Sequence, residues 1–161
     1  MGKRLVVDSD LCTGCLICAQ VCSLTKTGSC NPSRARVRVV DDERTGVTVP
    51  MVCHDCAEPV CAFCCPEGAI SKDPATGVVT ADVELCTSCR TCLEVCPYGA
   101  PLMDPVERQV YLCDHCGGEP ACVAVCPTGA LTYADVEDVT EDERCRDLCA
   151  SRRALLKAGG A

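Results

Sequence analysis

Residues 86–97 read CTSCRTCLEVCP, in which four cysteines follow the spacing Cys-x2-Cys-x2-Cys-x3-Cys and a proline comes next. Three cysteines at intervals of two residues wrap a loop around one iron–sulfur cubane, so that three sulfurs reach three irons. The fourth cysteine ligates the other cluster of a two-cluster pair, and we expect it to start a short helix that leads away from the loop. The proline fixes φ and helps the chain to turn out of the site.

Four motifs of this kind occur along the chain. Their cysteines are Cys12, Cys15, Cys18 and Cys22 in motif one, Cys53, Cys56, Cys61 and Cys65 in motif two, Cys86, Cys89, Cys92 and Cys96 in motif three, and Cys113, Cys116, Cys122 and Cys126 in motif four. Motifs one and three are compact, whereas motifs two and four have a longer gap before the third cysteine. This alternation indicates a duplicated two-motif unit. Motif one departs from the pattern, because Ser23 stands where the proline is expected.

Cysteine is far more frequent here than in an ordinary globular protein. It accounts for 20 of 161 residues, whereas the chain has one Phe, three Tyr and no Trp. So few large apolar side chains predict a thin organic core, and something else must hold the fold together. The 23 acidic and 15 basic residues give a formal charge of −8, which disfavours binding to DNA or RNA. No apolar run approaches the ~20 residues that a membrane span needs.

Iron–sulfur clusters, zinc sites and disulfides can each account for many cysteines. Zinc sites usually pair two Cys-x2-Cys knuckles across about 12–20 residues, and they rarely use three cysteines in a row before a Cys-Pro. Disulfides need an oxidising compartment. Residues 1–8 lack the apolar stretch of a removable leader, so we expect a cytoplasmic protein with reduced thiols. The pattern therefore favours four 4Fe-4S clusters, with zinc and disulfides as the alternatives.

The four motifs resemble those of the bacterial-ferredoxin-type electron-transfer subunits of dimethyl sulfoxide reductase, formate dehydrogenase and hydrogenase complexes. The resemblance covers residues 3–135, and all sixteen ligand positions are filled. The compact length is also similar to the small subunits that accompany tungsten enzymes of the aldehyde oxidoreductase type. The resemblance implies an α+β fold of two bacterial-ferredoxin-like modules, with short β-hairpins and short helices around four cubane clusters, plus a C-terminal helix.

The resemblance also implies which cysteines share a cluster. One cluster would be held by Cys12, Cys15, Cys18 and Cys126, and its neighbour by Cys22, Cys113, Cys116 and Cys122. A third would be held by Cys53, Cys56, Cys61 and Cys96, and a fourth by Cys65, Cys86, Cys89 and Cys92. Motifs one and four would then form a first module, residues 1–50 and 105–135, and motifs two and three an inserted module, residues 51–104.

Short strands are expected between the motifs, and a helix after them. The expected strands are residues 34–40, 47–49, 69–71, 78–80 and 109–112. Residues 136–161 are expected to form a C-terminal tail with a docking helix. Within it, residues 151–157 read SRRALLK, which resembles a twin-arginine export signal. We interpret this segment as the basic last turns of the helix, because cations favour the negative end of the helix dipole.

Three further groups of residues allow more than one interpretation. Alternation in residues 34–40 puts Arg34, Arg36 and Arg38 on one strand face, which is either a patch for an acidic partner or an ordinary solvated face. His54 and His115 lie inside Cys-x2-Cys loops, where each could replace a thiolate or donate a hydrogen bond near a sulfur. The cysteines outside the ligand sets are Cys30, Cys64, Cys145 and Cys149. These are expected to be small buried hydrophobic residues, and the alternatives are a further metal site or, for Cys64, ligand slippage with Cys65.

The sequence predicts electron transfer and no bond-making catalysis. It has no phosphate-binding loop, dinucleotide fingerprint or credible nucleophile–base pair. We expect a large catalytic oxidoreductase subunit as the partner, either a tungsten- or molybdenum-pterin enzyme or a hydrogenase, and a ferredoxin or flavin subunit as a further candidate. The alternatives are a free low-potential ferredoxin that shuttles between enzymes, and a cluster-based sensor or assembly scaffold. Arg90, between Cys89 and Cys92, is expected to make the motif-three cluster potential less negative.

Overall fold

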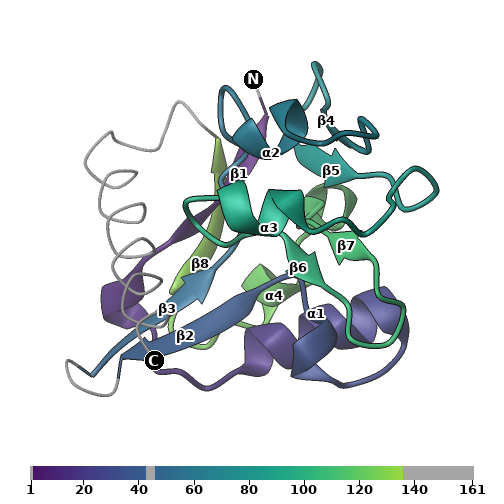
Figure 1. Cartoon of the computed structure of the whole chain (residues 1–161). Helices are drawn as coiled ribbons and strands as arrows, with labels where there is room; N and C mark the ends of the chain where they lie inside the picture. The colour runs from purple at the N-terminus through teal and green to yellow at the C-terminus, as the bar shows by residue number, and fades with distance from the viewer. Residues whose placement is uncertain (1, 43–45, 136–161) are drawn as a thin grey trace.

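The computed structural model describes residues 2–42 and 46–135, which form short helices and two-stranded sheets (Figure 1). The strands are β1 (Lys3–Val7), β2 (Arg38–Asp42), β3 (Val47–Met51), β4 (Ile70–Lys72), β5 (Val79–Ala81), β6 (Leu102–Met103), β7 (Val110–Tyr111) and β8 (Leu131–Asp135). The α-helices are α1 (Ile17–Thr27), α2 (Val60–Phe63), α3 (Thr91–Val95) and α4 (Ala121–Ala124). The 3-10 turns are η1 (Ser9–Leu11), η2 (Pro32–Arg34) and η3 (His115–Gly118). The mixed α+β composition expected from the sequence is confirmed.

All four sheets are antiparallel pairs of strands. Three are local hairpins, β2–β3, β4–β5 and β6–β7, whereas β1 pairs with β8 and so joins the two ends of the described chain. The expected strands 69–71 and 78–80 are each displaced by one residue from β4 and β5, the expected strand 109–112 contains β7, and the expected strand 47–49 covers the first three residues of β3. None of the described helices has the length and hydropathy that a membrane span requires. The predicted C-terminal helix lies outside the described residues.

The expected position of the helices relative to the cysteines was wrong. Each α-helix contains the third cysteine of its motif, and in motifs two, three and four it ends before the fourth. In these three motifs the fourth cysteine therefore follows the helix instead of starting one, whereas in motif one it lies inside α1. The reason is the proline after the fourth cysteine in these three motifs, because it lacks the N–H that a longer helix would need.

The residue after the fourth cysteine decides how long each helix is. In motifs two, three and four a proline stands there, and the helices have four or five residues. In motif one the residue is Ser23, and α1 continues for 11 residues to a left-handed Gly28. Ser23 is fully buried, and its hydroxyl donates to the carbonyl of Gln20 and accepts from the N–H of Asn31. The missing proline thus lengthens the helix and leaves the cysteine in place.

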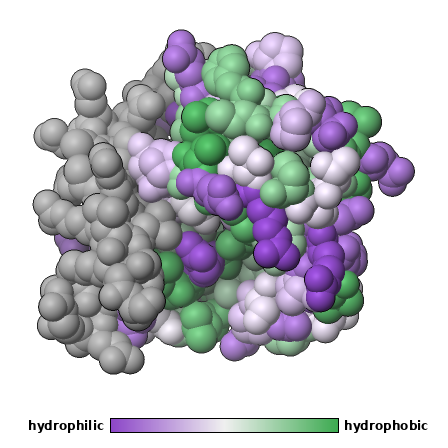
Figure 2. Space-filling view, in the orientation of Figure 1, coloured by the Kyte–Doolittle hydropathy of each residue, from purple (hydrophilic) through white to green (hydrophobic). Residues whose placement is uncertain are grey.

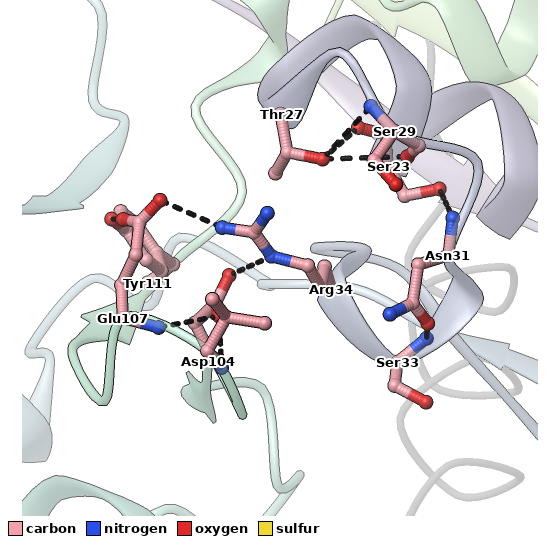
Figure 3. A network of polar contacts seen from close by, with 10 residues as sticks. Ser23, Thr27, Ser29, Asn31, Ser33, Arg34, Asp104, Glu107 and Tyr111 are labelled. Carbon is pink, nitrogen blue, oxygen red and sulfur yellow. Dashed lines mark hydrogen bonds and ion pairs between the residues drawn. The ribbon is translucent and has the colours of Figure 1, made fainter.

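The strand expected at residues 34–40 begins only at Arg38, and its three arginines do not form one exposed face. Arg34 lies in η2, where its guanidinium contacts Asp104 and Glu107 at 2.7 Å each (Figure 3). Arg36 contacts Asp114 at 2.7 Å and lies over the ring of Tyr111. Both interpretations offered for this face are therefore wrong for Arg34 and Arg36, because their charges are bound within the molecule.

The apolar core is small and is built around cysteine. Its buried aliphatic members come from most of the strands and include Leu5, Val37, Val52, Val79, Val110 and Leu131. Seven cysteines are among the nineteen buried residues of the same cluster: Cys18, Cys22, Cys53, Cys61, Cys92, Cys113 and Cys122. More than a third of the buried core therefore consists of residues that are expected to hold metal.

Candidate metal centres

One cavity is lined by four cysteines that come from two distant motifs. They are Cys22, from α1, and Cys113, Cys116 and Cys122, from motif four. We call this cavity the inner cavity, because three of these cysteines are buried. Its other walls combine apolar residues, among them Leu5, Val37 and Val52, with the charged residues Lys26, Arg36 and Asp114.

A second cavity has the same composition of thiols. It is lined by Cys65, from motif two, and by Cys86, Cys89 and Cys92, from motif three. We call it the outer cavity, because Cys89 is exposed to solvent and only Cys92 is buried. Ala69, Ile70 and Val110 form apolar walls, and Glu67 and Arg90 also line it. Each cavity thus brings three cysteines of one motif together with the fourth cysteine of another.

Eight of the predicted ligands line neither of these two cavities. The neighbouring thiols that raise their pKa values indicate which of them lie close together. The pKa of the Cys18 thiol is raised to about 11, mainly by burial and in part by the nearby thiols of Cys12, Cys15 and Cys126. Burial likewise raises the pKa of Cys61 to about 11, with Cys96 and Cys56 as the nearest negative neighbours. Cys126 therefore lies beside motif one, and Cys96 beside motif two.

The residue before the second cysteine has a left-handed backbone in all four motifs. These residues are Gly14, Asp55, Ser88 and His115, with φ between 45° and 69°. This conformation is unfavourable for residues other than glycine by roughly 1–2 kcal/mol. In three motifs it turns the residue's own N–H toward the sulfur of the first cysteine, so that Gly14, Asp55 and His115 donate to Cys12, Cys53 and Cys113. The loops thus direct backbone donors at sulfur, as sites for anionic groups do.

The donor set fits iron–sulfur clusters better than the alternatives. All described cysteines are free thiols, so the disulfide alternative does not apply to them. Within residues 2–42 and 46–135, no group of three Cys, His, Asp or Glu residues is close enough to hold a single metal ion. A zinc ion needs four donors at about 2.0–2.3 Å, whereas thiols spread around a cavity suit a larger cubane.

Burial in the inner cavity disfavours bare thiolates. Burial raises the pKa of Cys113 to about 12, and that of Cys122 also to about 12, with the neighbouring Cys22 thiol as a further cause for both. Thiolates are the metal-binding form of cysteine. Four negative charges in this site therefore need a cationic group such as iron, which would offset both burial and mutual repulsion.

Asp55 and His115 form a buried pair between the loops of motifs two and four. Their exposed fractions are 2% and 1%, and Nε2 of His115 lies 3.0 Å from Oδ2 of Asp55. Oδ1 of Asp55 accepts the backbone N–H of Val79 at 2.8 Å. From the sequence, His115 was expected either to replace a thiolate or to donate a hydrogen bond near a sulfur, and no role was expected for Asp55. Both positions stand directly before the second cysteine of their loops, and that shared position was the available signal.

The cysteines outside the ligand sets have no site of their own in the described residues. Cys30 and Cys64 are both exposed, so the expectation that they are buried hydrophobic residues was wrong. Their exposure follows from their positions, because Cys30 lies beyond the end of α1 and Cys64 caps α2 at its C-terminus. Cys65, and not Cys64, lines the outer cavity. Cys145 and Cys149 lie outside the described residues.

Comparison with known proteins gives family matches over most of the chain. The family model described as a 4Fe-4S dicluster domain matches residues 44–136, and that of a 4Fe-4S binding domain matches residues 5–23. The solved structure of the active site complex BamBC of benzoyl coenzyme A reductase with benzoyl-CoA aligns with 99% of this chain and 97% of its own, at 27% identity and a TM-score of 0.49.

Two curated relatives are subunits of oxidoreductases. The polyferredoxin-like subunit of aliphatic sulfonate oxidoreductase from Pyrococcus furiosus is 36% identical over 122 residues, which cover 76% of this chain and 70% of the relative. Subunit beta of NADH-dependent phenylglyoxylate dehydrogenase from Aromatoleum evansii is 34% identical over 144 residues, and these are 86% of this chain but 32% of the relative. The chain thus spans about a third of the second relative. It belongs to the 4Fe-4S dicluster domain family and is similar to the polyferredoxin-like subunit of an oxidoreductase.

Proposed function

We propose that this chain is a non-catalytic subunit that carries four 4Fe-4S clusters and relays single electrons between a catalytic oxidoreductase subunit and a redox partner. The observation that carries the proposal is the composition of the inner and outer cavities, each lined by four cysteines from two motifs. A bound cubane supplies a one-electron centre. The protein supplies the thiols, the backbone donors that offset negative charge, and walls that exclude water.

The proposed ligand sets are those that the resemblance implies. Cys22, Cys113, Cys116 and Cys122 would hold one cluster in the inner cavity, and Cys65, Cys86, Cys89 and Cys92 another in the outer cavity. Cys12, Cys15, Cys18 and Cys126 would hold a third, and Cys53, Cys56, Cys61 and Cys96 a fourth. The charge neighbours of Cys18 and Cys61 described above support the last two sets.

We further propose that motifs one and four form one ferredoxin-like module and that motifs two and three form the inserted one. Contacts between α1 and α4 and the pairing of β1 with β8 support the first module, and contacts between α2 and α3 support the second. The β6–β7 hairpin crosses the boundary between residues 104 and 105. It therefore ties the inserted module to the returning chain.

The four sites would form a single row. Burial is the main cause of the raised thiol pKa values of Cys122, Cys53 and Cys92, and a thiol from another ligand set contributes to each. That thiol is Cys18 for Cys122, Cys113 for Cys53 and Cys61 for Cys92. We infer that the two thiols of each pair lie near each other. Each of these contacts links a different pair of ligand sets. An electron could then pass from the motif-one site through the two interior sites to the outer cavity, with no bond broken and no proton moved.

The catalytic partner is proposed from the relatives, which are subunits of larger enzymes. A tungsten- or molybdenum-pterin enzyme, of which the aldehyde oxidoreductase type is one class, or a hydrogenase would use such a relay. A free ferredoxin is the second candidate, because a small chain with exposed cysteines at two sites could also act alone. The cytoplasmic location stays a prediction from the sequence.

Metal analysis of protein purified without oxygen tests the proposal. We expect about sixteen iron and sixteen acid-labile sulfide per chain, together with copurification of a large catalytic subunit that contains tungsten, molybdenum or nickel. Two to four zinc ions and no sulfide would overturn the cluster assignment. Iron-loaded protein that always elutes alone at the mass of one chain would favour the free ferredoxin.

A further inference from the structure

We propose that the surface around Cys89 is the docking site for a small acidic protein that carries one electron at a time. This inference rests on the proposed relay function and adds the place and the chemistry of one partner. The surface is defined by four exposed residues on the two chain segments that the Ser88–Arg108 hydrogen bond joins: Leu85, Arg90, Val106 and Arg108. We call it the Cys89 surface. Glu84 and Glu107 on the same segments are also exposed.

The Cys89 surface gives a partner protein close access to a candidate cluster site. Cys89 is exposed and lines the outer cavity, whereas three of the four inner-cavity cysteines are buried. Electron transfer between proteins weakens steeply with the distance between the two centres. A partner that contacts Cys89 would therefore approach the outer cavity as closely as the fold allows.

Two arginines give the Cys89 surface positive charge. The whole chain has a formal charge of −8, yet Arg90 and Arg108 both line one surface hollow. Arg90 follows Cys89 in the sequence, and the carbonyl of Arg108 accepts a hydrogen bond from Ser88, the residue before Cys89. Neither arginine has an ion-pair partner among the described residues, unlike Arg34 and Arg36. The one carboxylate in the hollow, Asp104, is 4% exposed and is already paired with Arg34.

Hydrogen bonds join the two chain segments that form the Cys89 surface. The hydroxyl of Ser88 donates to the carbonyl of Arg108 at 2.6 Å, and the amide of Gln109 donates to the carbonyl of Val83 at 3.4 Å. These bonds join the motif-three loop to the turn that precedes β7. The face that carries α3 and β6 shows hydrophilic and hydrophobic side chains side by side (Figure 2).

The exposed apolar side chains complete the picture of a transient interface. Val106 is 67% exposed and Leu85 is 52% exposed, and neither contributes to the core. A small apolar centre with a charged rim is typical of short-lived redox encounters, in which charge steers the partner and little area is buried. Two unpaired arginines select an acidic partner by charge complementarity.

The other exposed candidate ligand provides the contrast. Cys15 is also exposed, but its exposed neighbours in the sequence are Leu11, Leu16 and Ile17, with no arginine or lysine among residues 9–18. The basic residues thus accompany only one of the two exposed sites. The exchange at the Cys89 surface is balanced with one electron, which leaves the reduced carrier and enters the outer-cavity site or returns by the same route.

The test uses cluster-loaded full-length protein and, as the probe, a reduced 2Fe-2S ferredoxin of net negative charge, mixed rapidly without oxygen. We expect a second-order rate of electron transfer that falls as salt is added. Arg108→Gln and the double variant R90Q/R108Q should lower this rate, the latter by roughly tenfold, and flatten its salt dependence. Glu67→Gln, which removes a nearby negative charge, should raise the rate.

Two controls separate the possible failures. Lys3→Gln makes the same charge change on β1, outside the Cys89 surface, and should leave the rate unchanged. Titanium(III) citrate should reduce every variant to the same extent, and this result would show that the clusters are intact. Arg108 does not line the outer cavity, so Arg108→Gln also leaves the residues that line this cavity unchanged. Equal ferredoxin rates in wild type, Arg108→Gln and R90Q/R108Q would overturn the docking site. Protein that neither reductant reduces would overturn the relay function itself.

Discussion

The inner and outer cavities each contain four thiols, but the surroundings of these thiols differ. In the inner cavity the thiols of Cys113 and Cys122 are buried, and burial raises the pKa of each to about 12. In the outer cavity Cys89 is exposed, and a hydrogen bond with Thr91 lowers the pKa of its thiol. The cysteine spacing therefore does not by itself determine the properties of a site, because the surrounding residues determine how far the thiols are exposed to water.

This difference suggests that the sites of the proposed row exchange electrons with different partners. A site enclosed by protein exchanges electrons with its neighbours in the chain and is protected from solvent. A site that opens to solvent can exchange electrons with another protein, but it is also more accessible to oxygen and chelators. The predictions below test whether the two cavities differ in the ways that their walls imply.

The largest effect is expected from removal of the metal. Since seven of the nineteen buried core residues are candidate ligand cysteines, much of the stability should come from metal ligation. Reduced protein from which iron has been removed should show no cooperative thermal transition by circular dichroism, and the loss should involve both cavities. A sharp transition in iron-free, reduced protein would show that the organic core suffices.

Loss of iron should also be ordered in time. A chelator added to the loaded protein should remove the iron of the outer cavity first, because Cys89 is exposed and the inner cysteines are not. Spectroscopy during the reaction can follow the two populations. Loss from both cavities at one common rate would mean that exposure does not distinguish them.

The next effect is the loss of single clusters through ligands from another motif. Cys22→Ser should disturb the cluster held by Cys113, Cys116 and Cys122, while leaving the cluster of its own motif nearly intact, because Cys22 lines the inner cavity. The matched variant Cys65→Ser should likewise disturb the motif-three cluster. Paramagnetic resonance of the reduced variants distinguishes the sites. Loss of only the cluster of the substituted motif would contradict the proposed pairing.

Smaller effects are expected from the buried pair between the motif-two and motif-four loops. Asp55→Ala would leave His115 and the N–H of Val79 without their buried partner, which should destabilise the loaded protein by about 3 kcal/mol. Glu107→Ala is the matched control, because its contact with Arg34 is half exposed and should matter by about 1 kcal/mol or less. Chemical denaturation of the two variants measures the difference, and equal losses would deny the buried pair a special role.

Much of this arrangement could be predicted from the sequence, because cysteine spacing, prolines and turn residues act locally. The hairpin strands near residues 69–80 are examples. Long-range contacts were not visible in the same way. Arg34 leaves the expected strand because its guanidinium contacts Asp104, 70 residues later, and the contact between Asp55 and His115 joins two loops about 60 residues apart. Neither pairing has a periodic signal in the sequence.

The smallest expected effect concerns the reduction potential of the outer site. Arg90 lines the outer cavity, and its positive charge favours the more negative, reduced form of a bound cluster. Arg90→Gln should therefore make the potential of this site more negative, on the order of tens of millivolts, since water and salt screen an exposed charge. Arg108→Gln is the control, because Arg108 lines the surface hollow but not the cavity, and its effect should be smaller. Spectroelectrochemical titration at low and high salt measures both, and the difference between the variants should shrink as salt is added. If Arg90→Gln leaves every potential unchanged at low salt, the charge beside Cys89 serves docking alone and does not tune the site.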